Sequence, residues 1–355
     1  MFAFQNRAYS THVGHTTELE PILFDLSAPG SNPIPESSYQ KRDERTAFLV
    51  RQPGLDPSRQ SKVYALRDVE KLVKPHGPAL MRAYQSTMHR NYPILEDELF
   101  QHYESSKGHD IDPALLSAMY CLAVPSLLRE VGEGAAAPFD LVRLEDVAFR
   151  SFGESLCQPT LSTIQAGLLL MQRPNVDSKT LNTQLVGIAY ELGLHLDCSS
   201  WSVSNAERSL RKRLAWALYM QDKWCSLIHG RPSSISGTNW AVQGLEAVDF
   251  APSVKRAGEE SDSVEIDHGQ ALFTQMVGLT QILSDVLDTF YTLQAMQEVE
   301  DAGPNGTRLI LERAKPVQIK LKEWFARLPP SLKMDNGTTG KPSSTGKTNK
   351  SDASS

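Results

Sequence analysis

The chain has 355 residues, of which 40% are hydrophobic and 22% are charged, and its formal net charge is −6. These proportions are ordinary for a globular protein with a sizeable core. The negative charge argues against a chain that is a nucleic-acid-binding surface throughout, because such proteins present a basic face. No apolar run approaches the ~20 residues that span a bilayer, and the first residues lack the charged-then-apolar order of a signal peptide. We therefore expect a soluble intracellular protein.

The first segment, residues 1–60, is predicted to be largely disordered. Helices are broken there by proline, and the stretch SAPGSNPIPESS has too few hydrophobic residues to contribute to a core. The prolines concerned are Pro29, Pro33, Pro35, Pro53 and Pro57.

From Tyr64 onward the pattern becomes helical. Helices are predicted over residues 68–73, 77–88, 139–153 and 160–173, and another opens at Asp112-Pro113, where aspartate caps and proline is tolerated in the first turn. No stretch shows sustained alternation of polar and apolar residues between turn signals, so no sheet is expected.

Two further helices are joined by a distinctive turn. The first carries an apolar stripe and ends at Gly193, where a left-handed helix end favours a residue without a Cβ. The second opens with Ser204 and Glu207, the spacing of a capping box, and ends at Gly230-Arg231-Pro232, because proline cannot continue a helix. The stripe residues of the first helix are Leu181, Leu185, Ile188, Ala189 and Leu192.

After an acidic loop at 255–267, a long helix is predicted over 270–296 and a last one over 308–328. The Gly/Ser/Thr/Lys tail at 335–355 is almost without apolar residues and is expected to be disordered. The prediction is an all-α, multi-helix, bundle-like fold, with one domain over 61–334 between disordered ends.

The segments AYELGLHLD, ERSLRKRLAWALYMQDK and GRPSSI, in this order, resemble the signature of the fungal-specific transcription factor domain. LVKPHGPALMRAYQSTMHRNYPILEDELF, IDPALLSAMYCLAV and LSTIQAGLLLMQ resemble its earlier segments, so the resemblance covers roughly Tyr64 to Met334. LSTIQAGLLLMQRPN and LEAVDF are more narrowly similar to the nitrogen-catabolism coactivator branch. The matching positions, expected to be structural, are Gly193, His195, Asp197, Arg211, Trp216, Asp222, Gly230, Arg231 and Pro232.

The resemblance implies a nuclear regulatory domain that controls transcription through other regulators or coactivators, with homo- or hetero-oligomers as an option. In the family, a segment like RLPPSLKMD is followed by more helices, so we expect the domain to be incomplete at its C-terminal side or completed from elsewhere. If those helices are missing, an apolar surface would be exposed, and such surfaces invite partners or aggregation.

The cysteines argue against a zinc site in this chain. Cys121, Cys157, Cys198 and Cys225 are widely separated, whereas a closed thiolate shell needs closely spaced ligands. We expect four reduced cysteines in the core. The resemblance implies that zinc is held only by a separate cluster domain of full-length relatives, so DNA would be bound only indirectly or through that domain.

Charged side chains in the signature have structural interpretations. His195 lies near Asp197, but we expect a histidine favoured by the dipole of the helix end rather than an acid–base catalyst. The cluster Arg211 to Arg213 is expected on a solvated face. Asp222 and Arg231 are predicted to join in a charge-assisted hydrogen bond that pins the turn.

The sequence also bears on three other function classes. Asp285 and Asp288, with the acidic run at 298–301, suggest the metal–diphosphate site of an all-helical prenyl-transfer enzyme, but that chemistry needs two dense aspartate motifs. A helical small-molecule sensor or enzyme remains the alternative, with a cavity between the 270–296 helix and the signature pair. A pure adaptor without a DNA-binding partner would have the same sequence pattern as the regulator.

Overall fold

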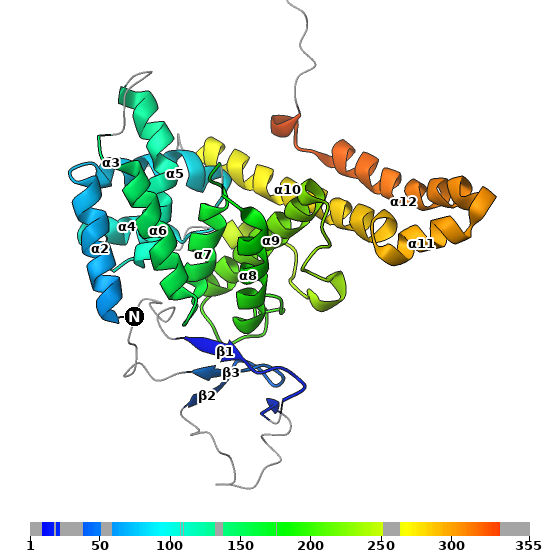
Figure 1. The fold of residues 1–355 in the computed structure, drawn as a ribbon, viewed down its shortest axis with the longest axis horizontal. Helices are drawn as coiled ribbons and strands as arrows, with labels where there is room; N and C mark the ends of the chain where they lie inside the picture. Colours follow the sequence, from blue (N-terminus) through cyan, green and yellow to red (C-terminus); the bar gives the residue numbers. More distant parts are fainter. Residues whose placement is uncertain are drawn as a thin grey trace, which may run out of the picture.

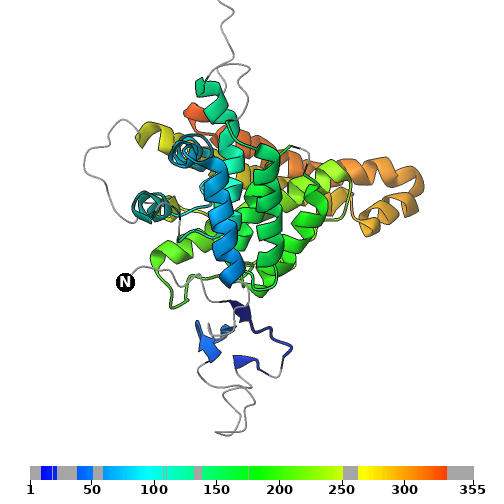
Figure 2. The same cartoon turned by 60° about the vertical axis from the view of Figure 1, so that its left-hand side comes forward.

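The computed structural model describes residues 9–17, 19–21, 38–50, 59–106, 108, 110–131, 138–174, 176–250 and 263–333. Figure 1 shows a helical body, a small sheet below it, and an arm formed by the last helices that projects to one side. The arm projects in Figure 2 as well. Within the described ranges, no helix combines the length and hydrophobicity that a bilayer crossing requires.

The body is built around α5 (Pro113–Val131), which is buried on nearly all sides. A helix that is apolar all round needs neighbours on every face, and α5 contacts α2 (Arg59–Val73), α3 (Gly77–Tyr84), α6 (Leu141–Ser155) and α7 (Leu161–Leu170). The predicted opening at Asp112-Pro113 is confirmed, because Asp112 accepts a hydrogen bond from the Ala114 N–H at 3.0 Å.

Two segments near α3 differ from the prediction. The helix predicted over 77–88 is α3 followed by a π-helical turn, η4 (Gln85–His89). The sequence did not predict α4 (Asp97–Ser106), which begins with Asp97 and Glu98, two acidic residues in its first turn that suit the helix dipole.

The signature pair forms α8 (Ser178–Glu191) and α9 (Asn205–His229), which lie against each other. Gly193 has φ +66°, so the predicted left-handed helix end is confirmed. The Ser204 hydroxyl accepts from the Glu207 N–H at 3.1 Å. The Glu207 carboxylate bonds Arg211 instead of returning to the cap, so only half of the capping box forms.

The arm contains the second half of α10 (Ser263–Phe290), α11 (Leu293–Asp301) and α12 (Gly306–Arg327). The long helix predicted over 270–296 is broken at residues 291 and 292, and Thr292 caps α11 by accepting from the Ala295 N–H at 3.1 Å. The last helix agrees with the prediction to within two residues at each end. Four short 3-10 turns complete the described part: η5 (Gly237–Asn239), η6 (Ala247–Phe250), η7 (Gly303–Asn305) and η8 (Pro330–Leu332).

The absence of a sheet was predicted wrongly. Strands β1 (Ser10–His12), β3 (Ala47–Val50) and β2 (Tyr39–Lys41) form an antiparallel sheet in the order β1-β3-β2, with Thr11 and Tyr39 both opposite Leu49. The sheet is joined to the body where Phe48, 1% exposed, meets Trp201 edge to face. Of the predicted disordered segment, residues 1–8, 18, 22–37 and 51–58 lie outside the described residues, as do the tail at 335–355 and most of the predicted acidic loop.

Candidate functional site

The turn after α9 is built by a left-handed glycine. Gly230 has φ +60°, and the Arg231 N–H donates back to the Ser226 carbonyl at 3.1 Å. The Ser226 hydroxyl also donates to the Arg231 carbonyl, so both backbone groups of Arg231 are used by the turn. Pro232 then prevents a further helical turn. The chain is thereby directed back along α9 toward Asp222.

Asp222 is the centre of the turn. It is 1% exposed and accepts hydrogen bonds from the Asn182 side-chain amide at 2.9 Å, the Ser234 N–H at 3.0 Å, the Ile235 N–H at 3.2 Å and the Ser233 hydroxyl. A buried carboxylate is stable only when its lone pairs are satisfied in this way. Asp222 therefore fixes the turn to α8 and α9 together.

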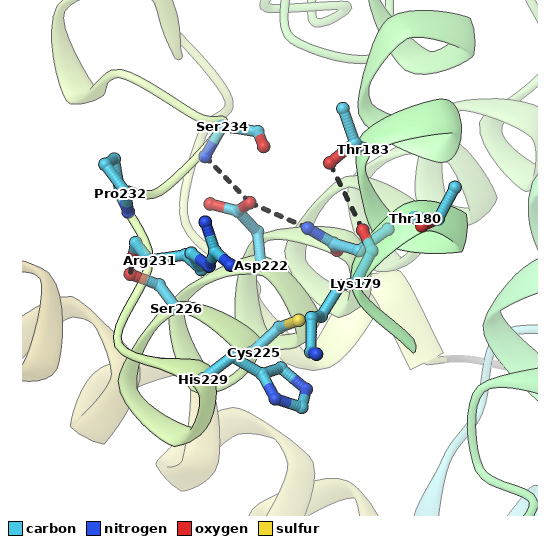
Figure 3. Close-up of a pocket in the computed structure, with 11 residues that line it drawn as sticks. Lys179, Thr180, Thr183, Asp222, Cys225, Ser226, His229, Arg231, Pro232 and Ser234 are labelled. Atoms are coloured by element: carbon cyan, nitrogen blue, oxygen red, sulfur yellow. Dashed lines mark hydrogen bonds between the residues drawn. The ribbon is translucent and has the colours of Figure 1, made fainter. Parts of the chain in front are cut away.

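The predicted partnership of Asp222 with Arg231 is wrong. No ion pair joins them among the described residues: both line the pocket, but no bond is drawn between them in Figure 3, and Arg231 is exposed. Asn182 and Ser233, which the sequence reasoning missed, hold Asp222 instead. The two serines of GRPSSI were the available signal, because a short hydroxyl side chain after a proline turn often bonds back to nearby acceptors.

Lys223 completes the network beneath the turn. Its Nζ donates to the Ser233 hydroxyl and to the Ile235 carbonyl, both at 2.6 Å, and lies 5.1 Å from the centre of the Tyr219 ring. Burial lowers the pKa of Lys223, and the nearby Asp222 carboxylate opposes that shift. The pair D-K of the signature is thus an internal structural element.

An open pocket of about 290 Å³ lies between the first turns of α8, the end of α9 and the turn (Figure 3). Its basic groups are Lys179, His229 and Arg231. The Asp222 carboxylate also lines the pocket, and four donors already satisfy it. No α10 residue lines it, so it is not the cavity predicted between the long helix and the signature pair.

One contact beside this pocket has the form of a nucleophile and its base. The Ser178 hydroxyl lies 3.2 Å from His229 Nε2. A catalytic triad also needs a group that orients the other ring nitrogen, and no described carboxylate bonds that nitrogen of His229. The predicted Asp285 and Asp288 lie elsewhere, on α10, where Asp285 pairs with Lys320 at 2.7 Å and Asp288 accepts from Ser284 at 3.3 Å.

The Gly193–Asp197 corner packs against the sheet. A Cβ on Gly193 would lie 2.8 Å from Phe48 Cζ, so glycine is required both by its φ and by this close approach. His195 lies among aromatic rings, with Tyr190 at 4.8 Å and His12 at 5.6 Å between ring centres. Asp197 accepts from Ser199 and Gln243 and has no bond to His195.

The predicted dipole-favoured charge on His195 is wrong. Burial, and then the neighbouring His12, lower the pKa of His195 to about 4. Its Nδ1 is buried without a hydrogen-bond partner in the described structure, which also opposes protonation. His195 is therefore a neutral packing residue at pH 7.

The basic cluster was predicted to be solvated, and that prediction is wrong as well. Arg211, Lys212 and Arg213 are 7%, 9% and 8% exposed. Arg211 bonds Glu207 at 2.9 Å and the Leu192 carbonyl at 3.0 Å, and its guanidinium lies over the Trp201 ring at 5.2 Å.

The two residues that follow Arg211 are likewise committed to internal partners. Lys212 pairs with Asp249 at 2.5 Å, and Arg213 donates to the Leu95 carbonyl at 3.1 Å. Burial lowers the pKa of Arg213, while Asp97 and Glu96 oppose that shift. The cluster joins distant parts of the chain and is not presented to a phosphate backbone.

Trp216 has the structural role that was expected. It is 5% exposed, and its Nε1–H donates to the Gln243 carbonyl at 2.8 Å, which fixes the segment after the turn against α9. Three of the cysteines are buried, but Cys157 is exposed, so the prediction of four core cysteines fails at that position. Among the described residues, no group of three His, Cys, Asp or Glu side chains is placed to hold a metal ion.

Comparison with known proteins is consistent with this architecture. The Fungal specific transcription factor domain matches residues 81–326. The chain is 32% identical over 341 residues to Transcriptional activator protein DAL81 of Saccharomyces cerevisiae, covering 83% of this chain and 34% of that protein. It is 31% identical over 229 residues to an uncharacterized transcriptional regulatory protein of Schizosaccharomyces pombe, covering 62% of this chain and 33% of the relative.

A third relative is Transcriptional activator protein acu-15 of Neurospora crassa, with 25% identity over 52% of this chain and 19% of that protein. The chain thus spans about a third or less of the length of these curated relatives. No solved structure matches the chain. The matched range includes α9 and its turn, and the family is one of transcription regulators rather than enzymes. The chain therefore belongs to the fungal-specific transcription factor domain family.

Proposed function

We propose that the chain is the helical regulatory region of a fungal transcription regulator, and that it acts through contacts with other proteins rather than by its own DNA readout. The observation that carries this proposal is the burial of Arg211, Lys212 and Arg213, each at most 9% exposed. Phosphate contacts supply most non-specific DNA affinity. The basic side chains of this cluster are already bonded to Glu207, Asp249 and two backbone carbonyls.

The site of action in this proposal is the nucleus, which the names of the relatives support in general terms. The partners are other transcription regulators or coactivators. The narrower resemblance to the nitrogen-catabolism coactivator branch, with the 32% identity to DAL81, supports control of nitrogen-catabolism genes as the biological role.

A tethering experiment tests the proposal. The full chain, fused to a foreign DNA-binding module, should change the output of a reporter gene that carries the module's site. The module alone is the first control, and a fusion carrying Leu214→Asp, which places a charge at a fully buried core position, is the second. A folded, nuclear fusion that leaves reporter output unchanged would contradict the proposal.

DNA binding by the isolated chain is measured separately. We expect no retention of duplex DNA at physiological salt, because the described basic cluster is internal. Tight, sequence-selective binding would show that the chain reads DNA itself and would refute the proposal.

We also propose that this chain binds no zinc. Cys121 and Cys198 are buried in different surroundings, and burial raises the pKa of both thiols, which disfavours the thiolates that zinc requires. Elemental analysis of the purified chain should find well under one zinc ion per molecule. One or two tightly held ions would contradict this expectation.

A further inference from the structure

Helix α12 turns an apolar strip to solvent. Leu311, Leu321 and Phe325 are 59%, 44% and 62% exposed. Their separations of ten and four residues place them on one side of a helix with 3.6 residues per turn. The opposite side of α12 packs on α10, where the Trp324 Nε1–H donates to the Gln275 carbonyl at 3.1 Å. These three exposed residues are called the α12 strip below.

The strip lies on a basic helix. Six basic and two acidic residues give α12 a net charge of +4. Four of the basic residues have ion-pair partners: Arg308 with Glu312, Arg313 with Glu298, Lys320 with Asp285, and Arg327 with Glu323.

The two remaining basic residues are next to the strip. Lys315 and Lys322 are exposed and have no ion pair among the described residues. Lys315 follows Leu311 by four positions and Lys322 precedes Phe325 by three, so both border the strip on the helix surface. Their own separation is seven residues, or about 10 Å along the helix axis.

This charge pattern distinguishes between possible occupants. A second copy of the chain, docked by the same strip, would bring Lys315 and Lys322 against the same two lysines in either helix direction. Duplex DNA offers nothing to bury Leu321 and Phe325 against its phosphates. Membrane-surface helices use clusters of about 4–8 basic residues, whereas only two uncompensated cations border this strip.

We propose that the α12 strip binds an acidic amphipathic helix of a partner protein. The apolar face of that helix covers Leu311, Leu321 and Phe325, and two of its carboxylates, two turns apart, pair with Lys315 and Lys322. This is the helix-on-helix mode of peptide recognition, in which apolar side chains anchor the peptide and charges fix its register. The inference rests on the proposed function, since it names the chemistry of one regulatory partner.

The test uses the purified full chain and a fluorescent designed peptide of about 20 residues. The peptide carries leucines at helical spacing and glutamates seven residues apart beside them. Fluorescence anisotropy should show saturable binding that weakens with added salt. The double substitution Lys315→Glu with Lys322→Glu should weaken binding about tenfold or more, and a peptide with lysines in place of the glutamates should recover it.

The matched control is Lys71→Glu with Lys74→Glu, two exposed lysines of the body, which changes the net charge equally and should leave the affinity unchanged. Leu321→Gln with Phe325→Gln should abolish binding while circular dichroism shows an unchanged helix content. In a background in which the exposed Cys157 is replaced by serine, Phe325→Cys should react with a thiol reagent at the rate of an exposed cysteine before peptide is added, and more slowly afterwards.

Three results would overturn the proposal. One is the absence of peptide binding, or a binding affinity that does not change when Lys315 and Lys322 are replaced by glutamate. Another is a dimer in sedimentation that Leu321→Gln and Phe325→Gln disperse, which would assign the strip to a second copy. The third is binding to vesicles with 30% anionic lipid in place of the peptide. The anisotropy assay contains no DNA or reporter, so its failure is distinguishable from failure of the tethered fusion.

Discussion

The body and the arm bury their side chains very differently, although both are helical. Sixteen large hydrophobic side chains are exposed in the described residues, and eight of them lie between Tyr291 and Phe325 in the arm. The same stretch contributes only Ala295 to the buried hydrophobic residues, whereas every residue of α7 in the body except Ser162 is buried. The described chain therefore buries most of the large hydrophobic side chains of the body. In the arm it leaves them exposed, and such exposed apolar surface is typical of a site that contacts another molecule or another segment.

The polar interactions differ in the same way. In the body, Asp222, Arg211 and Lys212 are buried and join segments that are distant in sequence. In the arm, pairs such as Arg308–Glu312 and Glu323–Arg327 lie one turn apart on an exposed helix. Such local pairs contribute about 0.2–0.5 kcal/mol each, while removal of one partner from a buried pair costs about 3–5 kcal/mol. The comparison therefore predicts large mutational effects in the body and small ones in the arm.

The largest effect is expected at Asp222. Asp222→Ala would leave the Asn182 amide and the Ser234 N–H without their acceptor, whereas the Ser233 hydroxyl and the Ile235 N–H would keep one other acceptor each. It would also remove the negative charge that offsets the burial of Lys223. The free energy of unfolding should fall by about 3–5 kcal/mol, measured by urea denaturation. Arg231→Ala is the control at the same turn and should change it by less than about 0.5 kcal/mol. Equal losses of stability for the two variants would instead support an Asp222–Arg231 ion pair, which the structure does not contain.

A second, smaller loss is expected where α10 meets the body. A Cβ on Gly269 would lie 2.0 Å from the Arg90 carbonyl oxygen, a backbone atom that cannot move alone. Alanine gains about 1 kcal/mol in helix propensity over glycine, but the clash should outweigh it, and Gly269→Ala should lose about 1–3 kcal/mol net.

Gly278 on the same helix provides the matched comparison for Gly269→Ala. Its added Cβ would meet only the Trp324 ring of α12, at 3.4 Å, which is an ordinary contact. Gly278→Ala should therefore gain up to about 1 kcal/mol. If Gly278→Ala destabilised the protein and Gly269→Ala did not, the result would contradict the prediction that α10 is packed more tightly at its body end than at its arm end.

The His195 corner predicts a pH dependence. The pKa of His195 is lowered to about 4 from an ordinary value of 6.5, chiefly by burial. A histidine with a lowered folded-state pKa contributes stability that is complete above pH 6.5 and is lost as the pH falls toward 4. Because His195 is only partly buried, we expect about 1–2 kcal/mol after allowance for solvent.

His195→Asn removes this titration and should flatten the fall in stability between pH 6.5 and 4. Glu96 acts in the opposite sense, since burial and Glu98 raise its pKa to about 7, so its contribution is lost as the pH rises from about 4.5 to 7. The difference between the native chain and His195→Asn cancels the Glu96 contribution. An unchanged pH profile in the variant would contradict the assignment of a neutral His195.

The helical fold could be predicted from the sequence because its signals are local. Gly193, Ser204 and Gly230 act within one turn of the helix ends that they define, and apolar stripes repeat along each helix. The sheet could not be predicted from the sequence because strands of three or four residues are too short to show an alternation of polar and apolar residues. The helix break before α11 was not predicted because the apolar repeat continues across it, and Thr292 is the only signal of the new N-cap.

The buried charges could not be predicted because their partners are distant in sequence. Lys212 pairs with Asp249, and Arg213 with the carbonyl of Leu95, more than a hundred residues earlier. An isolated run of basic residues is read as solvated, since burial of a charge is costly without a partner. The same reasoning failed for Asp222 and Arg231, because proximity in sequence suggested a pair that Asn182 and Ser233 replace.

The smallest effect is expected in the arm itself, at Leu293. This side chain is 85% exposed, so Leu293→Gln removes almost no buried apolar area and should change the free energy of unfolding by less than about 0.5 kcal/mol. Leu214→Ala in α9, where the side chain is fully buried, should lose about 2–5 kcal/mol in the same urea experiment. A loss above 1 kcal/mol for Leu293→Gln would mean that part of the chain covers this residue in solution, and the surface available to a partner would be smaller by that side chain. A neutral result, with the expected loss at Leu214, would leave the exposed surface of the arm available for recognition, because folding of the described chain would not require it.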